Sequence, residues 1–513
     1  MSTELNSADS RTPSKSGSVS GLDRWFEITQ RGSNRGREVR GGLVTFFAMA
    51  YIIALNPLII GTATDKDGNL VSGAPKFIDA AQGIVDGAAV GQSIAMVAAA
   101  TALVAGVMTL LMGIIGRYPI GVATGLGLNA MLAYVVAPTM TWPQAMGLVV
   151  WEGIIVLLLV LTGLREAIFR AVPPAMRTAM SVAIGLFITL VGLVDAGVIR
   201  PGNPLSQLGI NGSLIGWPIL VFILTLFGLL IMYVRNVKGA MLWAIFGGTV
   251  LAIIFEATFK PGPQGLGENP TGWALNVPAW PGWEAFGLPN LGLLGRVDLF
   301  GAFAPDGQFS FTAFLSAAML IFSLLLADFF DTIGTVMAVG TEGKIFNEDG
   351  EPPHLREILL VDSLGAIAGG LGSTSSNTSF IESASGVGEG ARTGFASVVT
   401  GLGFILAMFL SPVINMVPSE AVAPVLVLVG FLMMSQIGEI DWTQLELAIP
   451  AFLTIVIMPF TYSITDGLGA GFISYALLSA VRGKAKQVHP MMWVVAVLFL
   501  IYFLQGIIAG AIG

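Results

Sequence analysis

The sequence predicts an all-α polytopic membrane protein, and three observations support this fold class. Of the 513 residues, 54% are hydrophobic and only 11% are charged, whereas soluble domains are typically about half apolar and about a quarter charged. Apolar runs of about 20 residues recur from position 42 to the C-terminus, and each can cross a hydrocarbon core about 30 Å thick. These runs form two series of seven, separated by a polar stretch rich in Pro and Gly.

Fourteen candidate spans follow from these apolar runs. The first series comprises 42–61, 93–115, 122–137, 145–163, 178–195, 214–234 and 239–258. The second series comprises 312–334, 358–371, 377–390, 394–411, 420–437, 443–460 and 462–481. Because an odd number of spans in each half places the halves in opposite orientations, the sequence predicts a 7+7 inverted repeat of the transporter type. A further apolar segment at 490–511 is either a fifteenth span or an interfacial helix.

The polar segments indicate how the chain is oriented. Residues 1–40 contain no apolar core of the kind that a signal peptide needs, so we expect a disordered cytoplasmic tail. Basic residues precede the first span and follow the fourth and sixth, which places the N-terminus in the cytoplasm by the positive-inside rule. Residues 261–311 are then an extracytoplasmic loop. The sequence thus predicts a multi-pass protein of the plasma membrane, surrounded by the lipid bilayer.

Composition also excludes several classes of function. The chain has no cysteine, which rules out disulfides, thiolate metal sites and iron–sulfur clusters. Its two histidines, His354 and His489, lie in polar connections rather than in spans, and no basic patch indicates a nucleic-acid partner. There is no Walker A motif, so energy comes from an ion gradient unless a separate ATP-driven subunit exists. We expect no cofactor and no metal.

Two corresponding segments, 122–137 and 377–390, are short and polar for hydrocarbon. Each follows a Gly-rich span end and opens with small and polar residues, as in the run from Ala123 to Asn129 and the run from Ser373 to Ser379. Irregular backbone at membrane depth survives only where protein or a cavity covers it. We therefore predict two broken helices that face each other, with short loops between ordinary spans as the alternative.

Three acids lie inside these apolar segments. Asp328 and Asp331 are three positions apart, which puts them on neighbouring sites of one helical face, and Glu382 lies on the second broken segment. A charge at the bilayer centre costs about 2.5 to 3.5 kcal/mol on insertion scales, so such residues usually mark an ion or substrate path. Three neighbouring carboxylates cannot all ionise comfortably, so at least one should take up a proton near physiological pH. Which of the three carries the proton stays open.

Polar groups on other segments are further candidates. Asn129 offers both a donor and an acceptor to a ligand, or it caps the half-helix that follows Gly127, and the two roles are compatible. Glu152 and Asn56 are weaker candidates, which we expect to support the site.

At these residues the chain resembles the nucleobase–ascorbate transporter superfamily, and specifically its AzgA-like branch of adenine, guanine and hypoxanthine permeases. The resemblance runs from about 41 to 508. The segments that carry it are Thr45–Pro57, Gly125–Ala130, Ala327–Thr335, Phe380–Ser383, Glu389–Gly394 and Met458–Ser463.

The resemblance implies a fold of fourteen helices in two inverted repeats. It implies a core domain built from 41–165 and 312–412 and a gate domain built from 170–260 and 420–482, with short strands at spans three and ten and the substrate between them. Proton symport and homodimers are implied as well. The positions that match the substrate-contacting set of the family are Asn129, Asp328 and Glu382. Asp331 resembles the adjacent acid of the family, which adjusts either the binding site or the binding of the proton.

The sequence thus predicts a secondary active transporter that couples uptake of purine nucleobases to protons by alternating access, and not an enzyme. A purine presents N–H donors along one edge, and carboxylates are natural acceptors for them. Phe380 covers a purine face or packs against the core or lipid, and Ser383 completes the expected substrate-binding set. The alternatives are a related uracil/xanthine or anion carrier on the same fold, or a channel. Preference among adenine, guanine and hypoxanthine stays open.

Overall fold

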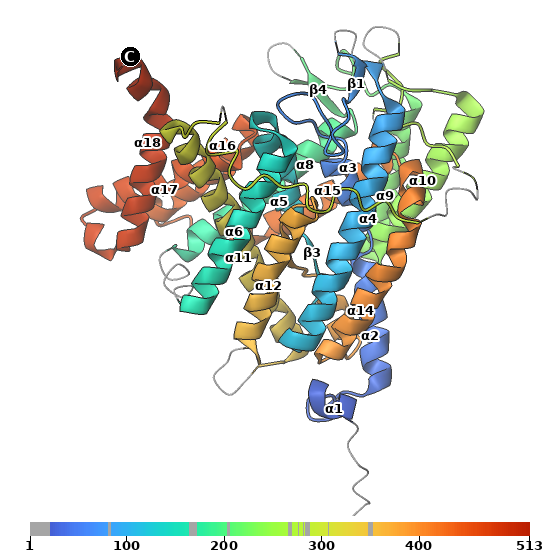
Figure 1. Ribbon diagram of the computed structural model, residues 1–513, viewed down its shortest axis with the longest axis horizontal. Coiled ribbons are helices and arrows are strands. Elements are labelled where there is room, and N and C mark those ends of the chain that lie inside the picture. Colours follow the sequence, from blue (N-terminus) through green and yellow to red (C-terminus); the bar gives the residue numbers. More distant parts are fainter. Residues whose placement is uncertain are drawn as a thin grey trace, which may run out of the picture.

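The computed structural model describes residues 21–80, 84–163, 172–202, 206–264, 269–274, 276–280, 282, 288–305, 307–346 and 352–512. These residues form a bundle made mostly of helices (Figure 1). Within this part of the chain, ten helices are long and apolar enough to cross a membrane. The prediction of a mostly helical polytopic membrane protein is confirmed, whereas the number of fourteen spans stays a prediction.

Each predicted apolar segment coincides with a helix or with a broken segment of the structure. The helices of the first half are α2 (Arg35–Met49), α3 (Ile52–Ile60), α4 (Gly87–Leu111), α5 (Leu126–Met131), α6 (Trp142–Thr162), α8 (Pro174–Asp195), α9 (Trp217–Val234) and α10 (Ala240–Phe259). Those of the second half are α11 (Phe311–Gly343), α12 (Leu355–Leu371), α13 (Ser383–Gly388), α14 (Gly394–Ala407), α15 (Ser419–Met434), α16 (Leu445–Thr461), α17 (Ile464–Val481) and α18 (Pro490–Ile512).

Local signals in the sequence explain where several of these helices begin. Asn34 and Asp86 accept hydrogen bonds from the first free backbone N–H groups of α2 and α4. Thr141 and Gln144 form a reciprocal capping box at the start of α6, which ends at Gly163 in the left-handed conformation. Such caps satisfy backbone groups that a helix end leaves without an intrahelical partner.

A short antiparallel strand pair joins the two halves of the chain at the broken segments. Strand β3 (Val122–Thr124) pairs with β6 (Asn377–Ser379), with Val122 opposite Ser379 and Thr124 opposite Asn377. All six residues are buried. The half-helix α5 follows β3, and the half-helix α13 follows β6. Strands β3 and β6 begin at residues 122 and 377, which are 255 positions apart in the sequence. The two segments thus meet in the interior.

Close backbone approaches require glycine in the last turn of α12 and at the start of α14. A Cβ atom at position 369 would lie 1.9 Å from the carbonyl oxygen of Ser375, and one at position 394 would lie 2.1 Å from that of Gly113. Both separations are far shorter than any carbon–oxygen contact allows. Glycine therefore permits the fold of the second broken segment and the packing of α14 on α4.

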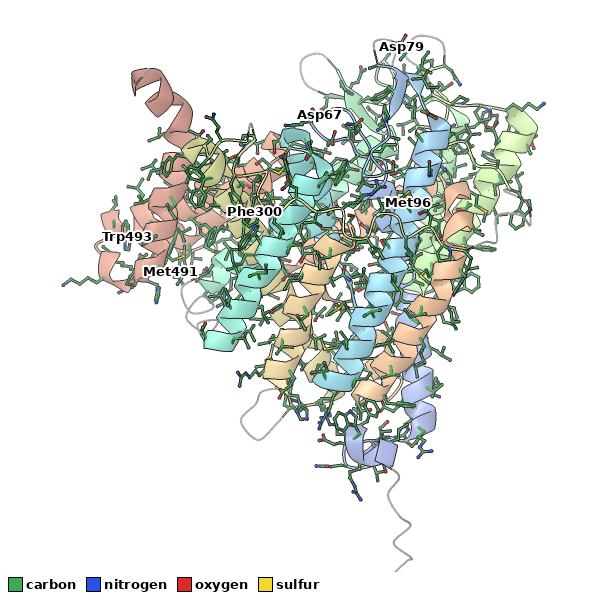
Figure 2. The ribbon with its side chains drawn as sticks, viewed as in Figure 1. Asp67, Asp79, Met96, Phe300, Met491 and Trp493 are labelled. Carbon is green, nitrogen blue, oxygen red and sulfur yellow. The ribbon has the colours of Figure 1, made fainter. Side chains whose placement is uncertain are left out.

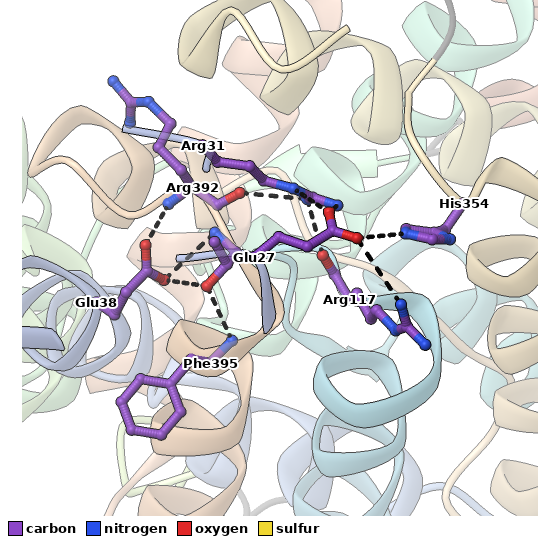
Figure 3. Close-up of polar contacts among 8 residues, drawn as sticks. Glu27, Arg31, Glu38, Arg117, His354, Arg392 and Phe395 are labelled. Carbon is purple, nitrogen blue, oxygen red and sulfur yellow. Dashed lines mark hydrogen bonds and ion pairs between the residues drawn. The ribbon is translucent and has the colours of Figure 1, made fainter. Parts of the chain in front are cut away.

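The N-terminal region corrects one expectation. Residues 1–20 lie outside the described residues, but 21–40, predicted to be disordered, form α1 (Gly21–Phe26), a turn and the first part of α2. Figure 3 shows the reason: Glu27 pairs with Arg31 at 2.7 Å and with Arg117 at 3.8 Å. Charged groups at the ends of distant helices thus order a segment that has too little apolar surface to order itself.

The described part of the predicted loop 261–311 packs along the bundle instead of standing away from it. Gly295 N donates to Leu371 O at 2.8 Å, and the Trp151 indole donates to Leu299 O at 2.8 Å. Figure 1 shows this segment crossing α12 and α4. Its side of the membrane stays a prediction.

The additional C-terminal segment forms α18, which packs against α17 and α11. Figure 1 shows α18 at one edge of the bundle, and Figure 2 shows Met491 and Trp493 at the same edge. Helix α18 has 23 residues, and its first part, residues 490–504, is apolar. Its relation to the bilayer stays open.

Candidate functional site

The residues that the sequence singled out surround the β3–β6 pair. Asn129 lies on α5, Glu382 directly precedes α13, and α11 carries Asp328 and Asp331. Helix α11 packs against α5, α13 and β6. One helix from the second half therefore runs alongside both broken segments.

Asn129 is fully buried on the first broken segment. Its Nδ2 donates to Thr124 Oγ1 at 3.2 Å, while its Oδ1 has no hydrogen-bond partner among the described residues. The N-cap of α5 is Gly125, and no side chain caps this helix. The capping role for Asn129 was therefore wrong, because the residue lies inside α5, and its amide oxygen remains available to accept a hydrogen bond.

The two acids of α11 occupy different environments. Asp328 is 0% exposed, whereas Asp331, three positions later, is exposed. The carboxyl group of Asp328 lies near that of Glu152 on α6, and the two interact. The structure thus places Asp328 in the interior and Asp331 at an exposed position of the same helix.

Glu152 is fully buried and also accepts from the Ser376 hydroxyl at 3.3 Å. Asn56 is buried too, and its Nδ2 donates to Thr101 Oγ1 at 2.8 Å and to Thr374 O at 3.2 Å. Both residues therefore contact the stretch that leads into β6. These contacts tie α6 and α3 to the second broken segment.

Glu382 lies at the start of α13 and is partly exposed. Its Oε1 accepts a hydrogen bond of 2.6 Å from the Tyr51 hydroxyl. The exposed Asp331 carboxyl is close enough to interact electrostatically with Glu382. Two carboxyl groups from α11 and the second broken segment therefore share the accessible part of the site.

Phe380 and Ser383 flank Glu382 but face protein. Phe380 is 5% exposed and belongs to the main apolar core, while its N–H donates to Gly121 O at 2.9 Å. The Ser383 hydroxyl accepts from Gly121 N at 3.0 Å. Both residues thus fasten the second broken segment to the backbone that leads into β3.

Asp362 on α12 is a buried acid that the sequence reasoning missed. Its two oxygens accept from Thr332 Oγ1 at 2.7 Å and from Ser379 Oγ at 3.0 Å. The Thr332 hydroxyl also lies 2.8 Å from that of Thr378. A signal was present, because Asp362 is an acid inside the apolar segment 358–371, as Asp328 is inside 312–334.

The arrangement suits recognition of a small polar molecule that presents hydrogen-bond donors. Among the described residues, no group of three or more His, Asp or Glu side chains has the geometry to hold a metal ion. The accessible groups are carboxylates, and the Asn129 amide oxygen is a further acceptor. Acceptors of this kind bind ligands that present N–H or O–H donors.

Comparison with known proteins agrees with a membrane carrier. Residues 82–470 match the family described as Permease family. The guanine/hypoxanthine permease PbuG of Bacillus subtilis (strain 168) is 37% identical over 485 residues, which cover 94% of this chain and 99% of that protein. The adenine permease AdeP of Escherichia coli (strain K12) is 34% identical and covers 94% of this chain and 95% of its own length.

Solved structures show the same fold at low identity. The transmembrane domain of the cyanobacterium bicarbonate transporter BicA has a TM-score of 0.54 and 14% identity, covering 85% of this chain and 97% of that one. The murine anion transporter Slc26a9, solved in an inward-facing state, has a TM-score of 0.57 and 10% identity, covering 94% of this chain and 77% of that one.

The matched range spans most of the chain, and the similar permeases align over nearly their whole length. The chain is therefore a transporter and not an enzyme. The chain belongs to the Permease family, in the AzgA-like branch of the nucleobase–ascorbate transporter superfamily.

Proposed function

We propose that this protein takes up purine nucleobases, namely hypoxanthine, guanine and/or adenine, in symport with protons by alternating access. The observation that carries the proposal is the strand pair β3–β6, which joins two broken segments bearing Asn129 and Glu382 next to the acids of α11. Binding sites of secondary transporters lie at such discontinuous helices near the middle of the bilayer.

The purine assignment is supported by the named activities of the similar permeases and by the inventory of the site. The relatives are named for guanine, hypoxanthine and adenine. A purine carries N–H donors on its ring and exocyclic groups, and Asp331, Glu382 and the Asn129 amide oxygen are acceptors. The same acceptors serve all three nucleobases, so the site chemistry by itself favours none of them.

The packing of the helices supports a division into two domains and fourteen spans. In one group, α6 packs on α12, α4 on α14, and α2 on α13 and α14; in the other, α8 packs on α15 and α16, and α16 on α17. The first group corresponds to the proposed core domain, 41–165 and 312–412. The second corresponds to the proposed gate domain, 170–260 and 420–482. Movement of one group against the other is the proposed transport step.

The proton has two candidate positions of different character. Asp331 and Glu382 are accessible, so either exchanges protons directly with water. Asp328 is buried, so a proton on this carboxyl group is held away from water. In the proposed cycle the outward-facing site takes up a proton on Asp331, Asp328 or Glu382, then binds a nucleobase, and then turns to the cytoplasm.

The proposed setting is the plasma membrane, with a cytoplasmic N-terminus and a homodimeric assembly. The orientation is supported by a cluster of basic groups at one end of the bundle. Arg31 donates to the carbonyl oxygens of Arg117 and Arg392 at 3.0 and 3.5 Å. The cytoplasmic side of a membrane protein is the side rich in Lys and Arg.

Uptake of labelled hypoxanthine in a host that lacks its own purine transport tests the proposal. We expect saturable uptake that excess adenine or guanine suppresses, that uracil leaves unchanged, and that a protonophore abolishes. Preloaded unlabelled substrate should accelerate entry, which separates a carrier from a channel. Uptake that uracil or xanthine suppresses most strongly, or that ignores the proton gradient, would contradict the proposal.

A further inference from the structure

Tyr51 occupies an unusual position in the first half of the chain. It lies at the break between α2 and α3, inside the candidate span Arg35–Ile60. The residue is 0% exposed, and its ring belongs to the main apolar core. A buried tyrosine normally needs a hydrogen-bond partner for its hydroxyl.

The partner of the Tyr51 hydroxyl is Oε1 of Glu382, at 2.6 Å and 331 positions away. A distance of this size is typical of a hydroxyl that donates to an ionised carboxylate. Glu382 is also partly exposed. A fixed ring at the break between α2 and α3 therefore holds one of the two acidic groups in the accessible part of the site.

The hydrogen bond determines which oxygen of Glu382 remains for a ligand. Because Oε1 accepts the Tyr51 hydroxyl, we expect an N–H group of the ligand to approach the other oxygen, Oε2. The Glu382 side chain has several rotamers. If the ligand itself has to fix one of them, the entropy lost by the side chain weakens binding. Tyr51 supplies this order before the ligand arrives, because its own ring is locked by the core.

We infer that Tyr51 is a positioning residue, which orients the Glu382 carboxylate so that Oε2 accepts a nucleobase N–H group. This inference rests on the proposed function, because it takes Glu382 to be a ligand-binding group. Tyr51 does not touch the substrate in this scheme and acts through Glu382.

The test compares Tyr51→Phe with Tyr118→Phe. Each change removes one oxygen and keeps a buried ring, and the Tyr118 hydroxyl donates to a backbone carbonyl, that of Val336 at 3.4 Å, rather than to a carboxylate. For Tyr51→Phe we expect the KM of purine uptake and the Kd of the purified protein to rise about tenfold, the typical effect of losing a hydrogen bond to a charged group. Vmax should stay within about twofold of wild type, and Tyr118→Phe should change neither constant by more than about twofold.

A double variant separates positioning from a structural role. If Tyr51 acts through Glu382, then adding Tyr51→Phe to Glu382→Gln should weaken binding by less than about twofold beyond Glu382→Gln alone. Independent, multiplicative losses would overturn the inference. So would a Kd for Tyr51→Phe equal to that of wild type.

Two further measurements keep the outcomes distinct. Incorporation of 3,5-difluorotyrosine at position 51 keeps the ring and strengthens the donor, so it should preserve binding. This test does not depend on whether Tyr51→Phe folds, and a loss of binding of about tenfold would overturn the inference. Hypoxanthine binding by the wild-type protein is measured in parallel. Wild-type protein that binds no purine contradicts the proposed function, whereas wild-type binding with unchanged Tyr51→Phe binding contradicts only the role of Tyr51.

Discussion

The Thr332 hydroxyl of α11 donates to Oδ2 of Asp362 on α12 at 2.7 Å. The other oxygen of the same carboxyl group accepts from Ser379 of β6 at 3.0 Å. One buried side chain thus links the helix that carries Asp328 and Asp331 to the strand that leads to Glu382. The geometry of the site depends on this link, because none of these elements is continuous with another.

Replacing Asp362 with Ala should destabilise the protein. The change leaves two buried hydroxyl groups without their acceptor, and each buried polar group that loses its partner costs about 1–3 kcal/mol. We expect a loss of about 2 kcal/mol or more, seen as a lower unfolding midpoint of the detergent-purified protein. Asp441→Ala, which removes an acceptor of Thr443 on an exposed turn, should change stability by less than about 0.5 kcal/mol. Equal midpoints for the two variants would refute the linking role.

Glu382→Gln should weaken purine binding. A neutral amide accepts through one oxygen and forms a weaker hydrogen bond than a carboxylate, so we expect the Kd to rise about tenfold or more. Equilibrium binding of labelled hypoxanthine to purified protein measures the effect. Glu389→Gln is the matched control, because Glu389 lies at the other end of α13 and pairs with Arg40 and Lys238. A similar loss in both variants would indicate damage to α13 rather than loss of a ligand contact.

Asp331→Asn should uncouple transport from the proton gradient while leaving the fold intact. The side chain is exposed, so its neutral analogue creates no buried vacancy and should keep the wild-type unfolding midpoint. In proteoliposomes we expect exchange of purine for purine to continue, whereas accumulation driven by an imposed pH difference should disappear. Accumulation at the wild-type level would exclude Asp331 as the coupling group.

Asn129→Ala and Asn56→Ala should separate binding from structural support. Asn129 has an amide oxygen that is open to a ligand, so its loss should raise the Kd for hypoxanthine about tenfold with a small change in stability. Asn56 donates to Thr101 and Thr374, so its loss should lower the unfolding midpoint while the Kd of the folded protein stays within about threefold. Paired binding and melting measurements decide the assignment. Reversed effects would exchange the two roles.

Docking of the N-terminal segment should weaken in acid. Glu27 lies outside the candidate spans. Burial opposes its ionisation, but its hydrogen bond and charge pairing with Arg31 outweigh this and lower its pKa below the ordinary value of a glutamate. Because the folded pKa is lowered, the stabilisation is present above the unfolded value and is lost as the pH falls through the folded pKa. Amide hydrogen exchange of residues 21–34 should therefore accelerate below about pH 4.5.

The matched variant for this pH effect is Glu27→Gln. It removes the titrating group shown with its partners in Figure 3 and should give faster exchange at neutral pH. Its exchange rates, corrected for intrinsic chemistry, should change little between pH 6 and about pH 4. An unchanged pH dependence in this variant would assign the effect to another group.

Much of the architecture was predictable from the sequence because span length and hydropathy are local properties. A run of about 20 apolar residues predicts a membrane helix wherever it lies. The same argument located the two segments that cannot be ordinary helices, since 122–137 and 377–390 are too polar and too rich in small residues. The structure has a half-helix and a strand in each of them.

The site itself was only partly predictable. The sequence identified Asn129, Asp328, Asp331 and Glu382 as polar groups in apolar surroundings, which is a local feature. It did not identify Asp362, although the same signal was present, because no resemblance drew attention to it. It also could not predict that Asp328 is buried and Asp331 is exposed. The two residues lie within one helical turn, and their sequence does not show which side of the helix faces the interior.

The sequence by itself determined that this chain is a helical membrane transporter with two broken segments and acids at membrane depth. Only the tertiary structure decided which side chains contact each other: Glu382 with Tyr51, and Glu152 with Ser376. The ordering of residues 21–40 was also decided there, by Glu27 and its distant partners. The physical reason is that hydropathy acts over one helix, whereas each of these contacts joins side chains from segments far apart in the chain, and only packing brings such segments together.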